Sequence, residues 1–186
     1  MQVILASASP RRKQLLSEII SEFEIIPAVG KEVVNANLTP EKIASSLAEQ
    51  KCEEVFLKHP EALVIGCDTI VVYNGKILGK PKDEKDAENT LLNLSGNTHQ
   101  VITGLCVKTA KNKIVTYAET LVNFNILSTQ FIKDYVKSGS PMDKAGSYGI
   151  QDGGLVKSFV GSYSNVVGLP IELLKETLIK IKEKND

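Results

Sequence analysis

Residues 62–83, ALVIGCDTIVVYNGKILGKPKD, hold the pattern that predicts the fold. The apolar run at residues 62–65 is typical of a strand that is buried on both faces. Gly66 is expected to end this strand, and Asp68 follows. A second β-branched and aromatic run then leads to Asn74-Gly75, the pair that a type I′ hairpin turn favours. The stretch therefore predicts a carboxylate where a core strand gives way to a hairpin, although a lone Asp there more often caps a turn.

Helical and strand periodicities alternate along the rest of the 186-residue chain. Helices are predicted after four capping residues, Ser9, Thr39, Asp83 and Ser128. Residues 99–107 and 114–124 alternate like strands joined by a short turn, which implies antiparallel pairing in a mixed sheet. Because no repeat, linker or low-complexity segment is present, residues 1–186 are predicted to form a single α/β domain.

Charge balance and cysteine content limit the classes of function. The 22 basic and 22 acidic side chains cancel, which argues against a broad surface for nucleic acid or membrane. No apolar run is long enough to span a bilayer, and no signal peptide is expected. Three widely spaced cysteines predict reduced thiols and a cytoplasmic location. Because His59 and His99 are isolated, a histidine triad or a zinc site is not expected.

Residues 7–12, SASPRR, combine hydroxyls, a helix start and two guanidinium groups. Ser9 followed by Pro10 is typical of a helix N-terminus. Arg11 and Arg12 then place positive charge in the first turn, where it opposes the helix dipole. Free amides, hydroxyls and guanidinium groups together suit a phosphate. The alternative is a pair of solvated arginines.

Other charged residues extend this chemistry. Lys51 falls within the apolar stripe of the second predicted helix, where it either faces a buried anion or, more commonly, snorkels to water. Asp68 and Glu32 are oxygen donors of the kind that hold Mg²⁺ or Mn²⁺ beside substrate phosphates. Lys80 ends the predicted hairpin and, with Lys51, can neutralise phosphate charge. This set fits metal-assisted attack of water on a phosphoanhydride.

Several blocks of the sequence resemble the Maf nucleotide pyrophosphatases, a family related to the inosine-triphosphate pyrophosphatases (Maf/Ham1-like). In order they are LASASPRR at 5–12, LAEQK at 47–51, IGCDT at 65–69, LGKP at 78–81, LSGNTH at 94–99, PMDKAG at 141–146, YGIQ at 148–151 and NVVGLP at 165–170. The resemblance implies a three-layer α/β/α fold with a mixed, partly antiparallel sheet. It also implies hydrolysis of a nucleoside triphosphate to the monophosphate and pyrophosphate with a divalent cation, Mg²⁺ or Mn²⁺.

The same resemblance implies a role for each matching residue. Asp68 becomes the proton acceptor that activates water, with Glu32 and Asp68 as metal ligands and Lys51 and Lys80 as further catalytic groups. The substrate-binding residues are Ser7, Ser9, Arg11, Arg12, Thr69, Lys144 and Gln151. Of these, Arg12, Thr69 and Gln151 occupy the specificity positions, and their combination resembles the branch that acts on dTTP and UTP. The Gln151 amide can donate to and accept from a uracil or thymine edge, although a plain loop residue is the alternative.

The leading hypothesis is therefore a dTTP/UTP pyrophosphatase that serves nucleotide-pool housekeeping. Its partner would be a small-molecule nucleoside triphosphate, a modified pyrimidine nucleotide such as 5-methyl-UTP included, and a homodimer is compatible with the family. The alternative is a nucleotide-binding regulator of cell division or septum formation with weak hydrolysis. Three positions depart from the family pattern: Cys67 stands where Ala is usual, Ser140 where Glu is frequent, and Asp152 where Gly is common.

Overall fold

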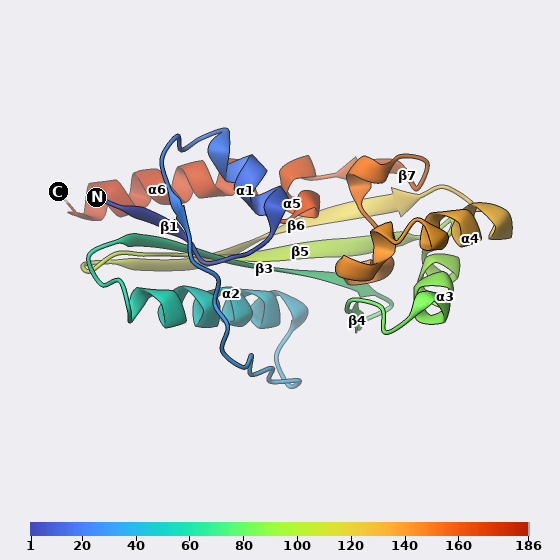
Figure 1. The fold of residues 1–186 in the computed structure, drawn as a ribbon, viewed down its shortest axis with the longest axis horizontal. Helices are drawn as coiled ribbons and strands as arrows, with labels where there is room; N and C mark the ends of the chain where they lie inside the picture. The colour runs from blue at the N-terminus through green and yellow to red at the C-terminus, as the bar shows by residue number, and fades with distance from the viewer. Residues whose placement is uncertain (186) are drawn as a thin grey trace. The chain divides into compact units, whose positions relative to one another are not determined.

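Strands and helices alternate along the chain in the computed structural model, which describes residues 1–185 (Figure 1). In chain order the strands are β1 (Val3–Leu5), β2 (Glu24–Ile25), β3 (Leu63–Tyr73), β4 (Lys76–Leu78), β5 (Thr98–Lys108), β6 (Lys113–Phe124) and β7 (Val156–Val160). The helices are α1 (Pro10–Ser17), α2 (Pro40–Phe56), α3 (Glu84–Leu94), α4 (Thr129–Lys137), α5 (Tyr163–Val167) and α6 (Ile171–Asn185). Three short 3₁₀ helices, η1 (Ser140–Asp143), η2 (Ala145–Ser147) and η3 (Ile150–Asp152), lie between α4 and β7.

The strands form one mixed sheet with the order β2-β1-β3-β5-β6-β7, and β4 pairs with β3. β1 pairs in parallel with both β2 and β3, whereas the β3–β4 and β6–β7 pairs are antiparallel. The hairpin turn has positive φ at Asn74 (49°) and Gly75 (72°), as a type I′ turn requires. The predicted α/β class with a mixed, partly antiparallel sheet is confirmed.

The chain folds into two compact units. The first comprises Met1–Asp68, Thr103–Ala118 and the segment from Gly168 to the C-terminus; the second comprises Thr69–Ile102 and Glu119–Val167. Strands β3, β5 and β6 contribute residues to both. That residues 1–186 behave as a single domain stays a prediction.

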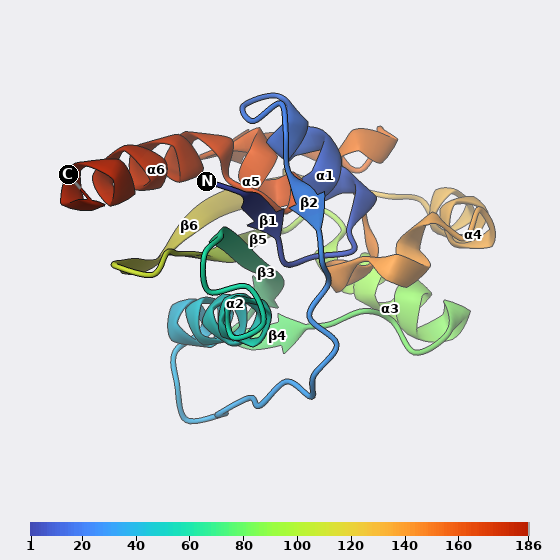
Figure 2. The same ribbon diagram turned by 60° about the vertical axis from the view of Figure 1, so that its left-hand side comes forward.

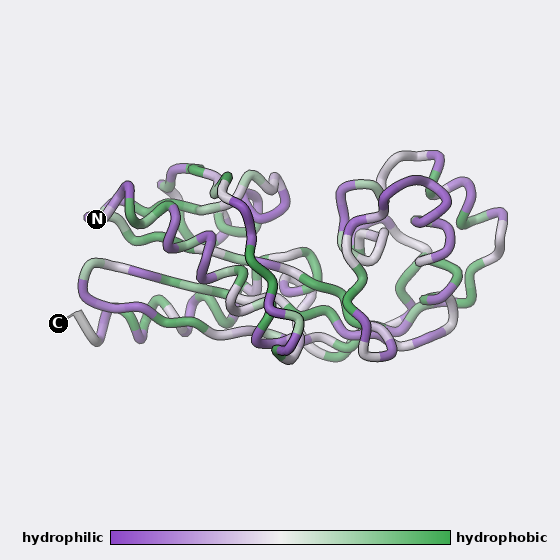
Figure 3. Tube along the Cα trace, turned by 90° about the horizontal axis from the view of Figure 1, so that it is seen from below, coloured by the Kyte–Doolittle hydropathy of each residue, from purple (hydrophilic) through white to green (hydrophobic). Residues whose placement is uncertain are grey.

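Within the first unit the sheet lies between two helical layers (Figure 2). Helix α2 covers one face, and α1 and α6 cover the other. Polar and apolar residues alternate along α6, the helix that ends at the C label in Figure 3, as expected of a helix with one buried face. On the α2 side, Ile4 and Val64 of the strands pack with Ala48 and Val55 of the helix. This is the three-layer arrangement that the resemblance to the Maf family implies.

Two glycines allow α2 to lie directly against the sheet. A β-carbon at Gly66 would lie 2.4 Å from the Ala48 carbonyl oxygen, and one at Gly104 would lie 2.1 Å from the Ala44 carbonyl oxygen. Ala44 and Ala48 are one helical turn apart, so β3 and β5 each meet a successive turn of α2. Any side chain at these two strand positions would push the helix away from the sheet.

The structure corrects one detail of the sequence prediction. β3 runs without interruption from Leu63 to Tyr73. Gly66 therefore does not end a strand, and Asp68 lies inside β3 rather than at its end. The reason is that Gly66 serves the close approach of α2, which a sequence pattern cannot distinguish from a strand-ending glycine.

In the second unit, α3 and α4 pack on the far halves of the long strands. Leu91 of α3 and Ile132 of α4 are fully buried in a cluster that includes Phe124 and Tyr148. The predicted helix caps are confirmed at three positions: Ser9 accepts a hydrogen bond from the Arg12 amide, Asp83 from the Asp86 amide, and Ser128 from the Phe131 amide. The Thr39 side chain makes no capping bond.

The buried cysteines lead to a chemical expectation. Cys52, Cys67 and Cys106 are free thiols with no exposed surface. The pKa of Cys52 is raised by its hydrogen bond with Cys106 and by burial, and burial raises the pKa of Cys67 to about 11. We expect the folded protein to be inert to a thiol reagent such as DTNB at about pH 8, and all three thiols to react in urea, because the thiolate is the nucleophile. Rapid labelling of the native protein would contradict the packing described above.

Candidate active site

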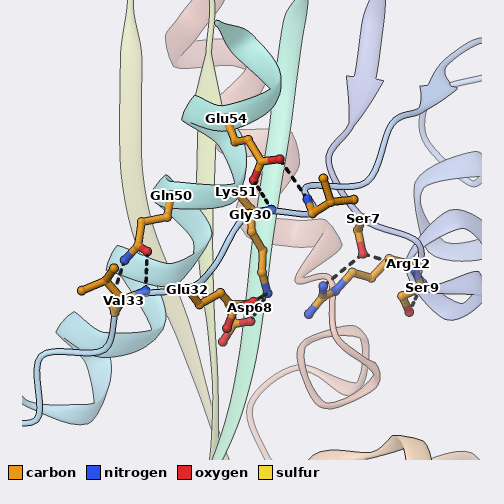
Figure 4. A network of polar contacts seen from close by, with 11 residues as sticks. Ser7, Ser9, Arg12, Gly30, Glu32, Val33, Gln50, Lys51, Glu54 and Asp68 are labelled. Carbon is orange, nitrogen blue, oxygen red and sulfur yellow. Dashed lines mark hydrogen bonds and ion pairs between the residues drawn. The ribbon is translucent and has the colours of Figure 1, made fainter. Parts of the chain in front are cut away.

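Lys51 lies at the centre of a cluster of charged side chains in the first unit (Figure 4). Its ammonium contacts the Asp68 carboxylate directly and lies 3.0 Å from Glu32 Oε1. The exposed fraction of the side chain is 18% for Lys51 and 14% for Asp68, but 46% for Glu32. Lys51 therefore faces anions instead of snorkelling to water.

Local packing explains why these groups meet. Gly66 and Asp68 are two residues apart on β3, so they share a face of the strand. Ala48 and Lys51 are three residues apart on α2, so they share a face of the helix. Because Gly66 brings the strand against Ala48, the next groups along each element, Asp68 and Lys51, come within hydrogen-bond reach.

A second group surrounds the start of α1, also in the first unit. The Arg12 guanidinium donates to Ser7 Oγ (3.1 Å) through Nη1 and to the Gly168 carbonyl (2.7 Å) through Nε. Ser7 is 8% exposed, and Ser9 caps the helix. Arg11 precedes Arg12 in the same turn. The structure thus brings Ser7, Ser9 and Arg12 together, and it adds Gly168, which sequence reasoning did not associate with them.

Four candidates lie in the second unit. Thr69 is half-buried on β3, Lys80 is exposed after β4, and Gln151 is exposed in η3. The Gly146 amide donates to the Gly79 carbonyl (3.1 Å), so the glycine-rich segment meets the chain beside Lys80. Lys144 is 11% exposed on its side chain and donates to the Ser140 carbonyl (2.5 Å) and to Asp143 (2.9 Å). Its ammonium is therefore bonded within its own loop.

Two of the three departures from the Maf pattern, Ser140 and Asp152, contact each other. Ser140 Oγ donates to Asp152 Oδ2 at 2.6 Å, and the Tyr135 hydroxyl donates to the same oxygen at 2.5 Å. Burial and the Asp152 carboxylate raise the pKa of Tyr135 above its usual range. Ser140 and Asp152 thus form a hydrogen-bonded pair, which places a carboxylate within the glycine-rich segment.

The donor chemistry bears on the predicted metal. Within residues 1–185 no cluster of three or more His, Cys, Asp or Glu side chains is arranged to hold a metal ion. Glu32 and Asp68 do converge on one lysine, and both are hard oxygen donors. Two carboxylates suit a cation such as Mg²⁺ that keeps waters and binds substrate phosphates, because it needs few protein ligands. The residues present therefore fit the predicted metal.

Comparison with known proteins decides the family. Residues 2–181 match the family model described as Maf-like protein. The chain belongs to the Maf family. It is 46% identical to a protein from Ruminiclostridium cellulolyticum (98% of this chain and 97% of the relative covered) and 48% identical to one from Aquifex aeolicus (96% and 94%), each named dTTP/UTP pyrophosphatase. The predicted family is confirmed.

A solved structure supports the fold alone. The Ham1 protein of Staphylococcus aureus superposes with a TM-score of 0.57 at 15% identity, covering 97% of this chain and 99% of that one. This chain therefore has the fold that the sequence resemblance implies.

Sequence reasoning missed two side chains that flank Lys51 on α2, Gln50 and Glu54. Both bond to the backbone of the segment that carries Glu32. The only available signal is their spacing, because residues four apart lie on the same face of a helix. Since the partners are backbone groups of an irregular segment, no residue pattern marks the contact.

The buried His99 gives an expected pH dependence of stability. His99 is 2% exposed and its Nε2 lies 2.7 Å from the Tyr148 hydroxyl. Burial lowers the pKa of His99 from 6.5 to about 4. The unfolded chain therefore binds a proton at His99 near pH 6.5, whereas the folded chain binds it only near pH 4. As the pH falls between these two values, the free energy of unfolding decreases by about 3 kcal/mol in total.

Urea unfolding at several pH values between about 7.5 and about 4.5 measures the effect. We expect the His99→Gln variant to lose less stability on acidification than the wild type, because Gln has no proton to gain. His59→Gln, at the only other histidine, is the matched control. An identical loss of stability in the wild type and in His99→Gln would show that His99 is not the group responsible.

Proposed function

We propose that this protein hydrolyses dTTP and UTP to the nucleoside monophosphate and pyrophosphate. The observation that carries the proposal is the contact of Lys51 with Asp68 and Glu32. It occurs in a chain whose relatives, matched over nearly their whole length, are named dTTP/UTP pyrophosphatase. Metal-assisted attack of water needs a carboxylate that accepts a proton and oxygen donors that hold the metal. Asp68 and Glu32 offer these groups in one cluster, and Lys51 adds a fixed positive charge.

In the proposed reaction Asp68 takes a proton from the attacking water, and the water oxygen bonds to the α-phosphorus as the α–β anhydride bond breaks. Lys51 fixes the Asp68 carboxylate so that one oxygen faces the water. A divalent cation, when bound by Glu32 and Asp68, would neutralise charge on the triphosphate. Pyrophosphate is then the leaving group.

The remaining candidates are proposed to bind the nucleotide. Ser7, Ser9, Arg11 and Arg12 offer hydroxyl and guanidinium donors to phosphate oxygens, and Arg12 is oriented for this by Ser7 and Gly168. Lys80 and Lys144 supply further positive charge. Thr69 and Gln151 are proposed to read the pyrimidine base.

The location and partners of the protein follow from the same proposal. We propose a cytoplasmic enzyme, because its three cysteines are free thiols. Among residues 1–185 no helix combines the length and the apolar character needed to cross a bilayer. A small-molecule nucleotide is the only partner that the proposed reaction requires, and a homodimer remains a proposal from the family.

A panel of triphosphates tests the proposal. With Mg²⁺ or Mn²⁺ present, pyrophosphate release from dTTP and UTP is expected to exceed release from dATP, dGTP and dCTP by at least about tenfold in kcat/KM. Including 5-methyl-UTP separates modified from ordinary pyrimidine substrates. Equal turnover of purine and pyrimidine nucleotides would contradict the proposed selectivity, and binding of dTTP without turnover would favour a regulatory role.

A further inference from the structure

The segment at residues 28–34 carries Glu32 and forms neither helix nor strand. Ala28 packs at the edge of the core, but the valines that follow are largely exposed, Val29 at 83% and Val33 at 69%, so burial of apolar surface contributes little to holding residues 29–34 in place. What holds it to α2 is a set of hydrogen bonds from two side chains, Gln50 and Glu54 (Figure 4).

Each of the two side chains makes a double contact. The Gln50 amide accepts from the Val33 amide and donates to the Val33 carbonyl, both at 2.9 Å. The two Glu54 oxygens accept from the amides of Val29 and Gly30, also at 2.9 Å each. These hydrogen bonds from backbone amides lower the pKa of Glu54 and so keep its carboxylate ionised. Hydrogen bonds to an ionised acceptor are stronger than those between neutral groups.

The geometry places Glu32 between the two attachments. Gly30 is two residues before Glu32, and Val33 is one residue after it. On the helix side, Lys51 lies between Gln50 and Glu54. The attachments therefore bracket the Glu32–Lys51 contact of 3.0 Å both along the segment and along α2. A groove of about 510 Å³ lies between this segment and α2, lined in part by these same residues.

We propose that Gln50 and Glu54 are positioning residues that keep Glu32 on Lys51, and so beside Asp68. This inference rests on the proposed function, in which Glu32 and Asp68 hold the cation. Without the attachments Glu32, which is 46% exposed on its side chain, would sample solvent instead of the cluster. Because misplacement of about 1 Å can reduce turnover strongly, the two side chains act on kcat through Glu32.

Gly30 provides an independent way to break the same contact. A β-carbon at Gly30 would lie 2.7 Å from Glu54 Oε2. Gly30→Ala is therefore expected to displace the Glu54 carboxylate and to reproduce the effect of Glu54→Ala while leaving α2 unchanged. Glu54→Gln, which keeps one acceptor oxygen, should fall between Glu54→Ala and the wild type.

The kinetic experiment compares Glu54→Ala, Gln50→Ala and Gly30→Ala with Glu49→Ala. Glu49 is the matched control because it lies on the same helix and lines the same groove, but its carboxylate pairs with Lys113 and not with the segment. The three test variants are expected to lower kcat for dTTP about tenfold, with an unchanged melting temperature, and Glu49→Ala is expected to leave kcat unaltered. Wild-type kcat in Glu54→Ala and Gln50→Ala would overturn the inference.

A double-mutant cycle separates positioning from a general structural role. In the Glu32→Gln background, Glu54→Ala is expected to cause no further loss of kcat, because Glu32 no longer supplies its charge. An equal fold-loss in both backgrounds would show that Glu54 does not act through Glu32, and would overturn the inference.

Hydrogen exchange supplies a readout that does not depend on activity. The amides of Val29 and Gly30 are expected to exchange at least about tenfold faster in Glu54→Ala than in the wild type, and that of Val33 faster in Gln50→Ala, because these bonds are their protection. Unchanged amide exchange rates in these variants would show that Gln50 and Glu54 do not hold the segment, and would overturn the inference. If the wild type releases no pyrophosphate, the proposed function fails by itself, and the exchange rates still decide whether Gln50 and Glu54 hold the segment.

Discussion

The Asp68→Asn variant is expected to turn over dTTP about 10³-fold more slowly than the wild type, with an unchanged fold. Asn has nearly the same shape as Asp and can still accept a hydrogen bond from Lys51, so packing around β3 should survive. It cannot take a proton from water, however, and it is a poor ligand for a cation. Pyrophosphate release under saturating dTTP measures the effect, and circular dichroism checks the fold.

Glu49→Gln is the matched control for this change. It removes a carboxylate that lies on α2, as Lys51 does, but that pairs with Lys113 and not with the Lys51 cluster. We expect its kcat to equal that of the wild type. Activity of Asp68→Asn within a few-fold of the wild type would remove Asp68 from the role of proton acceptor, and the Lys51 contact would then be structural.

The Gly104→Ala variant is expected to lose roughly 3 kcal/mol of unfolding free energy. The added carbon would lie 2.1 Å from the Ala44 carbonyl oxygen and 2.6 Å from the Ser45 amide nitrogen, so rigid helix backbone must move. Because α2 also carries Lys51, its displacement should lower kcat as well. Urea unfolding measures the stability, and the pyrophosphate assay measures the second effect.

Gly79→Ala is the control for the substitution itself. A β-carbon at Gly79 would have no neighbouring atom within 4 Å, and the φ angle of Gly79 is not positive. It should change the unfolding free energy by less than about 1 kcal/mol. If Gly104→Ala were equally mild, α2 would not be packed on β5 as closely as the structure shows.

The fold could be predicted from the sequence where local chemistry determines it. Asn74-Gly75 gives the hairpin, and Ser9 and Asp83 give helix starts, because turn and cap geometry depend on neighbouring residues. The position of Asp68 within β3 could not be predicted. Gly66 is required by the close approach of the Ala48 carbonyl on α2, and no local pattern reveals a tertiary contact of that kind.

The candidate site shows the same division. Asp68, Glu32 and Lys51 were predicted as chemically suitable groups, and the structure brings them together. The sequence left open whether Lys51 faces an anion, because that depends on how closely α2 approaches β3. Gln50 and Glu54 escaped prediction since they bond to backbone groups, which every residue possesses.

The identity of the products tests the central claim most directly. Phosphorus-31 NMR of a dTTP reaction follows each phosphate group, with Asp68→Asn as the blank. The proposed α–β cleavage predicts dTMP and pyrophosphate in equal amounts, with no early dTDP. Accumulation of dTDP and orthophosphate would contradict it, since that outcome requires cleavage of the β–γ bond.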